Sequence, residues 1–294
     1  MAKYSIKDLE TLSGVKAHTI RIWEQRYGLL VPERTATNIR SYNDVELKKL
    51  LQANVLYNNG YKISKIAAFS QKQILEEIDF LSRKEDARSV AIEALTIAMI
   101  EMNEHSFDDI LNSKIEAQGL DKTMEDIVYP FLSRIGVLWI TGVIEPAQEH
   151  FISNLIRQKI IVAINNVPNK LEEESPVCIA FLHQDEMHEL GLLYYTYHLK
   201  VVGYKVIYLG QMTPYSDVIK TSEINKPSLI LTSFVKVIDQ DWFDEYVQKL
   251  CKDFSYCNVV ISGIGASKST VDCNNLFKVS SANHLVETVL HFNS

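Results

Sequence analysis

The chain has 294 residues, of which 47% are hydrophobic and 23% charged, enough apolar material for two or three small cores. Its longest apolar runs are interrupted by charged residues, and residues 1–9 lack the apolar segment of a secretory signal, so we expect a cytoplasmic protein without a membrane span. Residues 1–70 hold 11 Lys and Arg against 6 Asp and Glu, whereas the rest of the chain holds 19 against 31, a distribution that suits nucleic-acid binding at the N-terminus.

The N-terminal segment predicts two short helices. Ser5 can cap the first, whose apolar residues recur at helical spacing. In the second, Ile20, Trp23 and Tyr27 share one face and are expected in the core, and Gly28 ends the helix. The opposite face of this second helix is basic. Such a pair is typical of a helix-turn-helix, whose second helix enters the major groove of DNA.

A hairpin is predicted over residues 29–42, followed by a helix through Leu56 that Asn43 and Glu46 would start as a capping box. The pattern Y-S-I-x-x-L-x-x-x-S-G-V-x-x-x-T-I-R-x-W-E-x-R-Y-G-L-L-x-P-x-R, within residues 3–70, resembles the winged helix-turn-helix of the MerR family. The resemblance implies a DNA-binding domain over residues 1–75. It also implies DNA contacts from the recognition helix and the wing, through Lys16, His18, Thr19, Arg21, Arg26, Arg34, Asn38, Arg40 and Tyr42.

The middle of the chain, residues 80–168, predicts a four-helix bundle. Its apolar-periodic stretches cover residues 83–103, 106–118, 121–140 and 146–166. The fourth begins at Pro146, so Glu149 and His150 fall near the positive end of the helix dipole. The dipole favours a carboxylate and disfavours a charged imidazole there. We therefore expect the ring of His150 to be neutral and able to act as a metal ligand.

Trp139 precedes this pair by ten residues. Each of the three residues taken singly has an ordinary alternative, as core filler, helix-end charge or interfacial histidine. The spacing W-x9-E-H, however, resembles the helix that covers the upper face of the corrin in the CarH/LitR light-responsive repressors. The resemblance implies that Trp139 and Glu149 line the pocket of the upper axial group, and that His150 can bind cobalt after that group leaves.

Strands alternate with helices in the last part of the chain, residues 175–294. We expect strands at 177–182, 204–209, 228–234, 258–262 and 277–280. The alternation predicts a flavodoxin-like (Rossmann-type) parallel sheet with a ligand at the carboxyl ends of its strands. His188 lies in the loop after the first strand, and Glu186 can hold its ring by a hydrogen bond.

The run Glu186-Met-His-Glu-Leu-Gly191 resembles the E/D-x-H-x-x-G loop of cobalamin-binding domains. The resemblance implies that His188 is the lower axial cobalt ligand and that Gly191 lies beside the corrin. Variants of the S-x-L and G-G-x-G motifs of these domains follow, with Val235 for leucine and Ser262 for glycine. They imply a slot for the nucleotide tail lined by Ser233, Gly263 and Gly265.

These features predict a multidomain, non-enzymatic transcriptional repressor. As the resemblance implies, it binds adenosylcobalamin, assembles as a dimer or tetramer on double-stranded operator DNA, and is released when light breaks the cobalt–carbon bond. Two alternatives stay open. One is a MerR-type regulator that senses another small molecule, or a corrinoid without photochemistry. The other is a corrinoid methyl-carrier protein, a class that has no use for residues 1–70.

Overall fold

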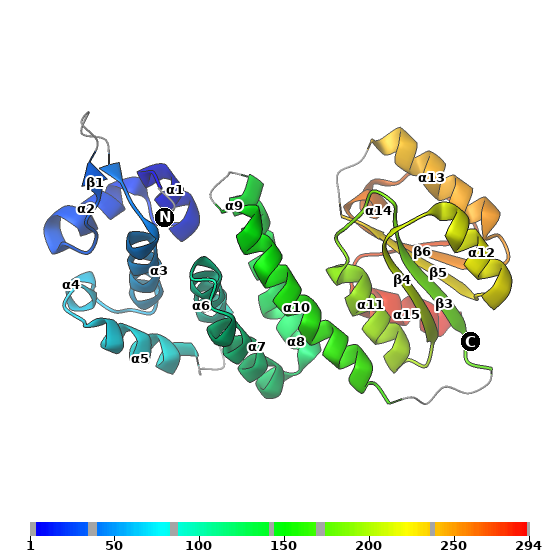
Figure 1. The fold of residues 1–294 in the computed structure, drawn as a ribbon, viewed down its shortest axis with the longest axis horizontal. Coiled ribbons are helices and arrows are strands. Elements are labelled where there is room, and N and C mark those ends of the chain that lie inside the picture. Colours follow the sequence, from blue (N-terminus) through cyan, green and yellow to red (C-terminus); the bar gives the residue numbers. More distant parts are fainter. Residues whose placement is uncertain are drawn as a thin grey trace. The chain divides into compact units, whose positions relative to one another are not determined.

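The protein was analysed as a computed structural model that describes residues 4–34, 40–82, 88–140, 144–168, 174–235 and 239–292, without the side chains of Asp79, Ser82, Val137, Trp139 and Ile140. It contains two compact units, Met1–Leu155 and Ile156–Ser294 (Figure 1). Two predicted site groups, Asn38 of the wing and the side chain of Trp139, lie outside the described part. Within that part, no helix combines the length and the apolar character needed to cross a membrane.

The N-terminal helices and hairpin form a winged helix-turn-helix, as predicted. Its elements are α1 (Ile6–Ser13), α2 (Ala17–Tyr27), β1 (Glu33–Arg34), β2 (Arg40–Ser41) and α3 (Asp44–Asn58). Ser5 caps α1 by accepting the backbone N–H of Asp8, and Gly28 ends α2 in the left-handed region with a φ of 62°. Ile20 and Trp23 are buried, as predicted for the core face of α2, whereas Tyr27 on the same face is only half-buried.

The predicted capping box at α3 is half present. Asn43 accepts the backbone N–H of Glu46 at 3.1 Å. The side chain of Glu46, however, accepts the backbone N–H of Val31 at 2.7 Å and pairs with Lys49. The reciprocal half of the box was therefore predicted wrongly, because a backbone donor from the segment before the wing reaches this buried carboxylate.

Helices form the rest of the first unit. They are α4 (Ile63–Ile66), α5 (Gln71–Ser82), α6 (Arg88–Ile100), α7 (Glu104–Gln118), α8 (Leu120–Thr123), the π-helix η1 (Met124–Val128) and α9 (Tyr129–Ile140), and α10 (Pro146–Asn166) continues into the second unit. The sequence did not predict η1. Pro130 has no N–H to give to the carbonyl of Asp126, and the N–H of Tyr129 instead reaches back five residues to Met124. The wider turn thus accommodates the proline.

Arg134 of α9 connects the winged domain to the helices. Its guanidinium forms two bonds to the carboxylate of Glu93 in α6, at 2.8 and 3.3 Å, and donates to the carbonyl of Leu12 in α1 at 2.5 Å. Burial raises the pKa of Glu93, and the charge of Arg134 opposes this shift. Lys48 of α3 also pairs with Glu101, which follows α6. These contacts hold the winged domain and the helices in one compact unit.

The second unit contains the last part of α10, from Ile156 to Asn166, and after it the predicted flavodoxin-like domain. Its elements are β3 (Val177–His183), α11 (Leu190–Val201), β4 (Lys205–Thr213), α12 (Tyr215–Asn225), β5 (Leu229–Phe234), α13 (Gln240–Asp253), β6 (Asn258–Gly263), α14 (Ile264–Lys268), β7 (Leu276–Val279) and α15 (Ala282–His291). The strands are parallel in the order β4-β3-β5-β6-β7. The chain adds β4 on one side of β3 and the later strands β5, β6 and β7 on the other side, so the strand order has a switch point between β3 and β5. Ligands of this fold bind at the carboxyl ends of the strands at such a switch point.

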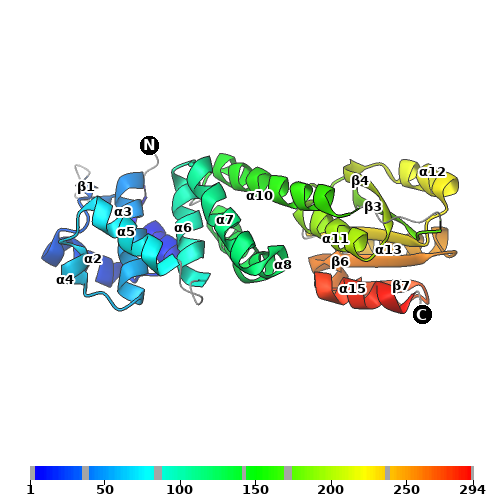
Figure 2. The same ribbon diagram turned by 90° about the horizontal axis from the view of Figure 1, so that it is seen from below.

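Helices cover both faces of this sheet. Phe181, Ile230 and Phe234 pack with α12 and α13 into one buried cluster. Side chains alternate along a strand, so Ala180, Leu231 and their neighbours of the same parity face the other side, where α11 contacts α15. Figure 2 shows α12 and α15 on opposite sides of the sheet. Each face of the sheet therefore has its own buried layer of side chains. The predicted ligand loop begins at the carboxyl end of β3, between these two layers.

Candidate functional site

His188 lies in the loop between β3 and α11, at the switch point of the sheet. Its Nδ1 atom is 2.5 Å from Oε1 of Glu186. An ionised carboxylate only accepts hydrogen bonds, so the ring N–H at Nδ1 donates to it. The side chain of Glu186 is 2% exposed, whereas that of His188 is 60% exposed. The buried carboxylate thus orients an imidazole at the surface, and a metal ligated by this ring would be bound through Nε2.

Glu186 also fixes the backbone around it. Oε1 accepts the N–H groups of Met187 and His188, each at 3.0 Å, and Oε2 accepts the N–H of Val235 at 2.9 Å. Val235 directly follows β5. One carboxylate therefore ties the loop after β3 to the loop after β5. The structure brings Glu186 and His188 together as expected from their spacing, whereas the bond to Val235 depends on the order of the strands.

Exposed apolar side chains gather at this edge of the sheet. Met187, Met212, Val235 and Ile264 all follow or end a strand at its carboxyl end, and they are 61, 55, 38 and 46% exposed. The backbone N–H of Met212 donates to the carbonyl of Glu186 at 3.4 Å, so this residue belongs to the same loop cluster. Large apolar side chains around an exposed imidazole are typical of a binding surface for a large, partly apolar ligand.

Gly263 and Gly265 have packing roles in the fold itself. Gly263 has a φ of 91°, and a Cβ there would lie 2.2 Å from the carbonyl oxygen of Phe234. A Cβ at Gly265 would lie 3.0 Å from the ring of Phe243. The close approach of β6 to β5, and of α14 to α13, therefore requires small residues. Contact of these glycines with a nucleotide tail stays a prediction.

Ser233 lies on the sheet face that α11 covers. It is 3% exposed and pairs in register with Ser262, which is fully buried. Gly191 stands in the first turn of α11, and a Cβ there would meet no described atom within 4 Å. The structure thus places Ser233 and Ser262 next to each other in the core. The assignment of Ser233, Ser262 and Gly191 to a ligand slot also stays a prediction.

Glu149 and His150 lie in the first turns of α10. Glu149 accepts the hydroxyl of Ser153 at 2.5 Å, and Nδ1 of His150 lies 2.7 Å from the other carboxylate oxygen. The side chain of His150 is 72% exposed. A carboxylate thus holds Nδ1 of a surface imidazole here as well as at His188. Trp139 belongs to α9, and the direction of its side chain lies outside the described residues.

The recognition helix α2 presents cations. The residues predicted to contact DNA from this helix and its preceding turn are exposed at Lys16, His18, Arg21 and Arg26 and half-buried at Thr19. Glu10 organises the start of the helix, because its carboxylate accepts the backbone N–H of Ala17 at 3.0 Å and binds the ammonium of Lys16 at 3.1 Å. The outward face of α2 is therefore available to phosphates and bases.

Glu24 organises the wing. Its carboxylate accepts Nε of Arg40 at 3.0 Å and the hydroxyl of Tyr42 at 3.0 Å, and lies 3.7 Å from Arg34. Tyr42 is 1% exposed, and burial with the bond to Glu24 raises the pKa of its hydroxyl. Tyr42, predicted as a DNA contact, is thus placed in the core, where it supports the wing. Arg40 is also partly covered and shares this carboxylate.

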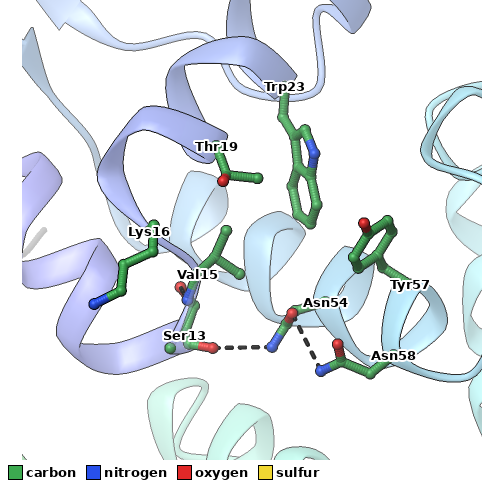
Figure 3. A pocket seen from close by; sticks show the side chains of 9 residues that line it. Ser13, Val15, Lys16, Thr19, Trp23, Asn54, Tyr57 and Asn58 are labelled. Atoms are coloured by element: carbon green, nitrogen blue, oxygen red, sulfur yellow. Dashed lines mark hydrogen bonds between the residues drawn. The ribbon is translucent and has the colours of Figure 1, made fainter.

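A hollow of about 360 Å³ lies between the turn after α1 and the helix α3 (Figure 3). The amide of Asn54 donates to the carbonyl of Ser13 at 2.9 Å across its base, and the rings of Trp23 and Tyr57 meet edge to face at 5.3 Å. Its lining consists of Ser13, Gly14, Val15, Lys16, Thr19, Trp23, Asn54, Tyr57 and Asn58. The Asn54 bond fixes the turn of the helix-turn-helix to α3 and so sets the orientation of α2.

Sequence reasoning gave no role to Glu189, the neighbour of His188. In the fold Glu189 is buried, and its carboxylate accepts hydrogen bonds from Arg157 and Tyr208. Its partners lie 32 and 19 residues away along the chain, and the sequence offers no local signal for either contact.

Two known families match parts of the chain. The MerR HTH family regulatory protein matches residues 4–73, and the B12 binding domain matches residues 91–163. With the winged helix and the parallel sheet described above, these matches define a MerR-type transcriptional regulator that carries a cobalamin-binding domain.

Among its relatives are two HTH-type transcriptional repressors of Myxococcus xanthus. The chain is 29% identical to CarH over 254 residues, which cover 84% of each protein, and 24% identical to CarA over 266 residues, 89% of this chain and 86% of CarA. It therefore resembles the CarH and CarA repressors. The monomethylamine corrinoid protein of Methanosarcina barkeri shares its fold, with a TM-score of 0.55 and 15% identity over 70% of this chain and 100% of that protein.

Proposed function

We propose that this regulator binds adenosylcobalamin through His188, assembles on operator DNA as a homo-oligomer while the cofactor is bound, and leaves the DNA when light breaks the cobalt–carbon bond. The observation that carries the proposal is the exposed His188 ring, held by the buried carboxylate of Glu186 at the switch point of the sheet. Repression of transcription is the expected output, as the names of CarH and CarA indicate for those proteins.

The residues of the loop fit a corrin. The imidazole of His188 would hold the cobalt of a bound corrin. Glu186 makes Nε2 of His188 a stronger ligand by accepting the N–H at Nδ1. The exposed side chains of Met187, Met212 and Val235 offer apolar contact to a wide macrocycle. Ser233, Gly263 and Gly265 are proposed to line the slot for the nucleotide tail.

The start of α10 supports a role at the upper face. When bound, adenosylcobalamin supplies a cobalt–carbon bond that light can break. Trp139 and Glu149 would contact the adenosyl group of the bound cofactor, and His150 would offer cobalt an imidazole ligand in the absence of that group. Glu149 already holds Nδ1 of His150, so the Nε2 atom would be the ligand.

The winged helix supports operator binding. Lys16, His18, Arg21 and Arg26 are exposed on α2 or just before it, where a recognition helix meets the major groove. Neutralisation of phosphates by this cationic face would supply affinity for any DNA, and base contacts would supply specificity. A homo-oligomer would place two such helices on two half-sites of an operator.

The first experiment combines an absorption spectrum with size-exclusion chromatography of the purified protein and adenosylcobalamin, in the dark and after green light. We expect a bound corrinoid whose spectrum changes irreversibly while the oligomer dissociates. Binding without a change in assembly would indicate a corrinoid sensor without photochemistry, and no binding would indicate another ligand. His188→Ala should lose binding and assembly, and His284→Ala, which changes an exposed histidine of α15, is the matched control.

A further inference from the structure

Glu189 is the second buried carboxylate of the loop that presents His188. Its side chain is 8% exposed. Oε1 accepts Nε of Arg157 at 2.5 Å, and Oε2 accepts the hydroxyl of Tyr208 at 2.7 Å. Arg157 belongs to α10 and Tyr208 to β4. Both oxygens of this carboxylate are therefore bonded to elements other than the loop itself.

Helix capping does not explain the position of Glu189. The residue stands directly before α11, where a carboxylate often accepts a backbone N–H of the first turn. Here its side chain makes no capping bond. Burial and the bond to Glu189 raise the pKa of the Tyr208 hydroxyl, so Tyr208 remains a neutral donor at physiological pH. The carboxylate thus serves a tertiary contact.

Arg157 brings α10 into this contact. The helix is continuous from Pro146 to Asn166, and Arg157 lies seven residues after His150, two turns along the same helical face. Arg157 also falls within residues 91–163, which match the B12 binding domain. A displacement along or about the axis of α10 would therefore act on the carboxylate next to His188.

We infer that Glu189 is a positioning residue that couples α10 to the His188 loop through its ion pair with Arg157. The inference rests on the proposed function and specifies how the two cofactor-binding segments would communicate. Glu186 sets the direction of the His188 ring, and Glu189 sets the position of the loop relative to α10. A change at the start of α10 reaches the lower ligand through this pair, and a change at the lower ligand reaches α10.

The ligand-free protein tests the coupling by hydrogen–deuterium exchange. Glu189→Gln keeps the size of the side chain and removes its charge, and Arg157→Gln removes the partner. Each should raise exchange in both segments, the α10 turns around Arg157 and the loop 184–189. Arg157→Lys should restore part of the protection, because it keeps the cation. Arg88→Gln, which breaks the ion pair of an exposed arginine with the half-buried Asp126, is the matched control and should leave both segments unchanged.

The cofactor-bound protein tests the consequence. Glu189→Gln should bind hydroxocobalamin within about threefold of the unchanged protein, since Glu186 still holds His188. The ratio of DNA affinities with and without adenosylcobalamin should fall about tenfold, within the usual range of coupling between sites. The double variant should lose no more than either single variant, because the two residues act as a pair.

Unchanged exchange in α10 for both single variants would overturn the inference, whatever the cofactor does. If the unchanged protein binds no cobalamin, the proposed function fails, while the exchange measurement still decides whether Glu189 couples α10 to the loop. If cobalamin binds and Glu189→Gln keeps the full DNA-affinity ratio, the coupling role is refuted and the proposed function stands.

Discussion

Replacement of Glu186 by glutamine tests how the His188 loop is built. The carboxylate accepts four hydrogen bonds, three at Oε1 from Met187 and His188 and one at Oε2 from Val235. A glutamine amide has only one oxygen. If that oxygen accepts the three donors of the loop, the NH2 group faces the N–H of Val235, and two donors oppose each other. In the reverse orientation the NH2 group faces the three donors of the loop. The variant therefore loses at least one bond in either orientation.

The expected magnitudes follow from that count. One backbone N–H left without an acceptor costs about 1–3 kcal/mol. In a unit of this size, each kcal/mol lowers Tm by about 2–4 °C. Loss of the carboxylate that orients a metal-binding histidine lowers ligand affinity by about 10- to 100-fold. We therefore expect a lower Tm for ligand-free Glu186→Gln, together with weaker binding of hydroxocobalamin.

The assays are a thermal melt followed by circular dichroism and a visible-absorption titration with hydroxocobalamin. Glu186→Asp is the control, because it keeps the charge and conforms to the E/D-x-H-x-x-G pattern. It should keep more affinity than Glu186→Gln. A glutamine variant that binds within twofold of the unchanged protein would refute the reasoning on His188. A lower Tm with unchanged affinity would leave Glu186 with a structural role alone.

Three further changes have defined outcomes. Gly263→Ala should cost at least about 2 kcal/mol in urea denaturation, because its φ is 91° and its Cβ would meet the carbonyl of Phe234. Arg134→Met should cost about 3 kcal/mol at pH 7 by leaving Glu93 buried without its cation. The pKa of Glu93 is raised in the folded state, so ionisation of Glu93 destabilises the fold when the pH rises above the pKa that this group has in the unfolded chain. The stability lost in Arg134→Met should therefore be smaller at pH 5 than at pH 7. Arg21→Ala should weaken binding to all DNA sequences alike and lower the salt slope by about 1, as gel shifts at several salt concentrations would measure.

Local signals in the sequence determined the elements. Ser5 and Gly28 begin and end their helices as predicted, since a capping hydroxyl and a residue that tolerates positive φ act within one turn of the chain. The alternation of strands and helices predicted the parallel sheet. The pairing of Glu186 with His188 is local too, because the two residues lie only two positions apart in one loop.

Contacts between distant segments were decided only by the tertiary structure. Tyr42 was predicted at the DNA surface, but Glu24, 18 residues away, receives its hydroxyl in the core. Glu46 was expected to complete a capping box, but its carboxylate accepts the backbone N–H of Val31 instead. Residue type and spacing predicted neither contact, since both depend on which backbone donors and side chains the folded chain brings near a buried carboxylate.

Glu189 illustrates the division most directly. The sequence places it beside a histidine of recognisable chemistry, whereas its bonds to Arg157 and Tyr208 exist only because α10 and β4 meet the same loop. Local propensity and capping act over a few residues and can be inferred from the sequence. The burial of a charge requires donors from several segments at once, and only the packed fold determines which donors those are.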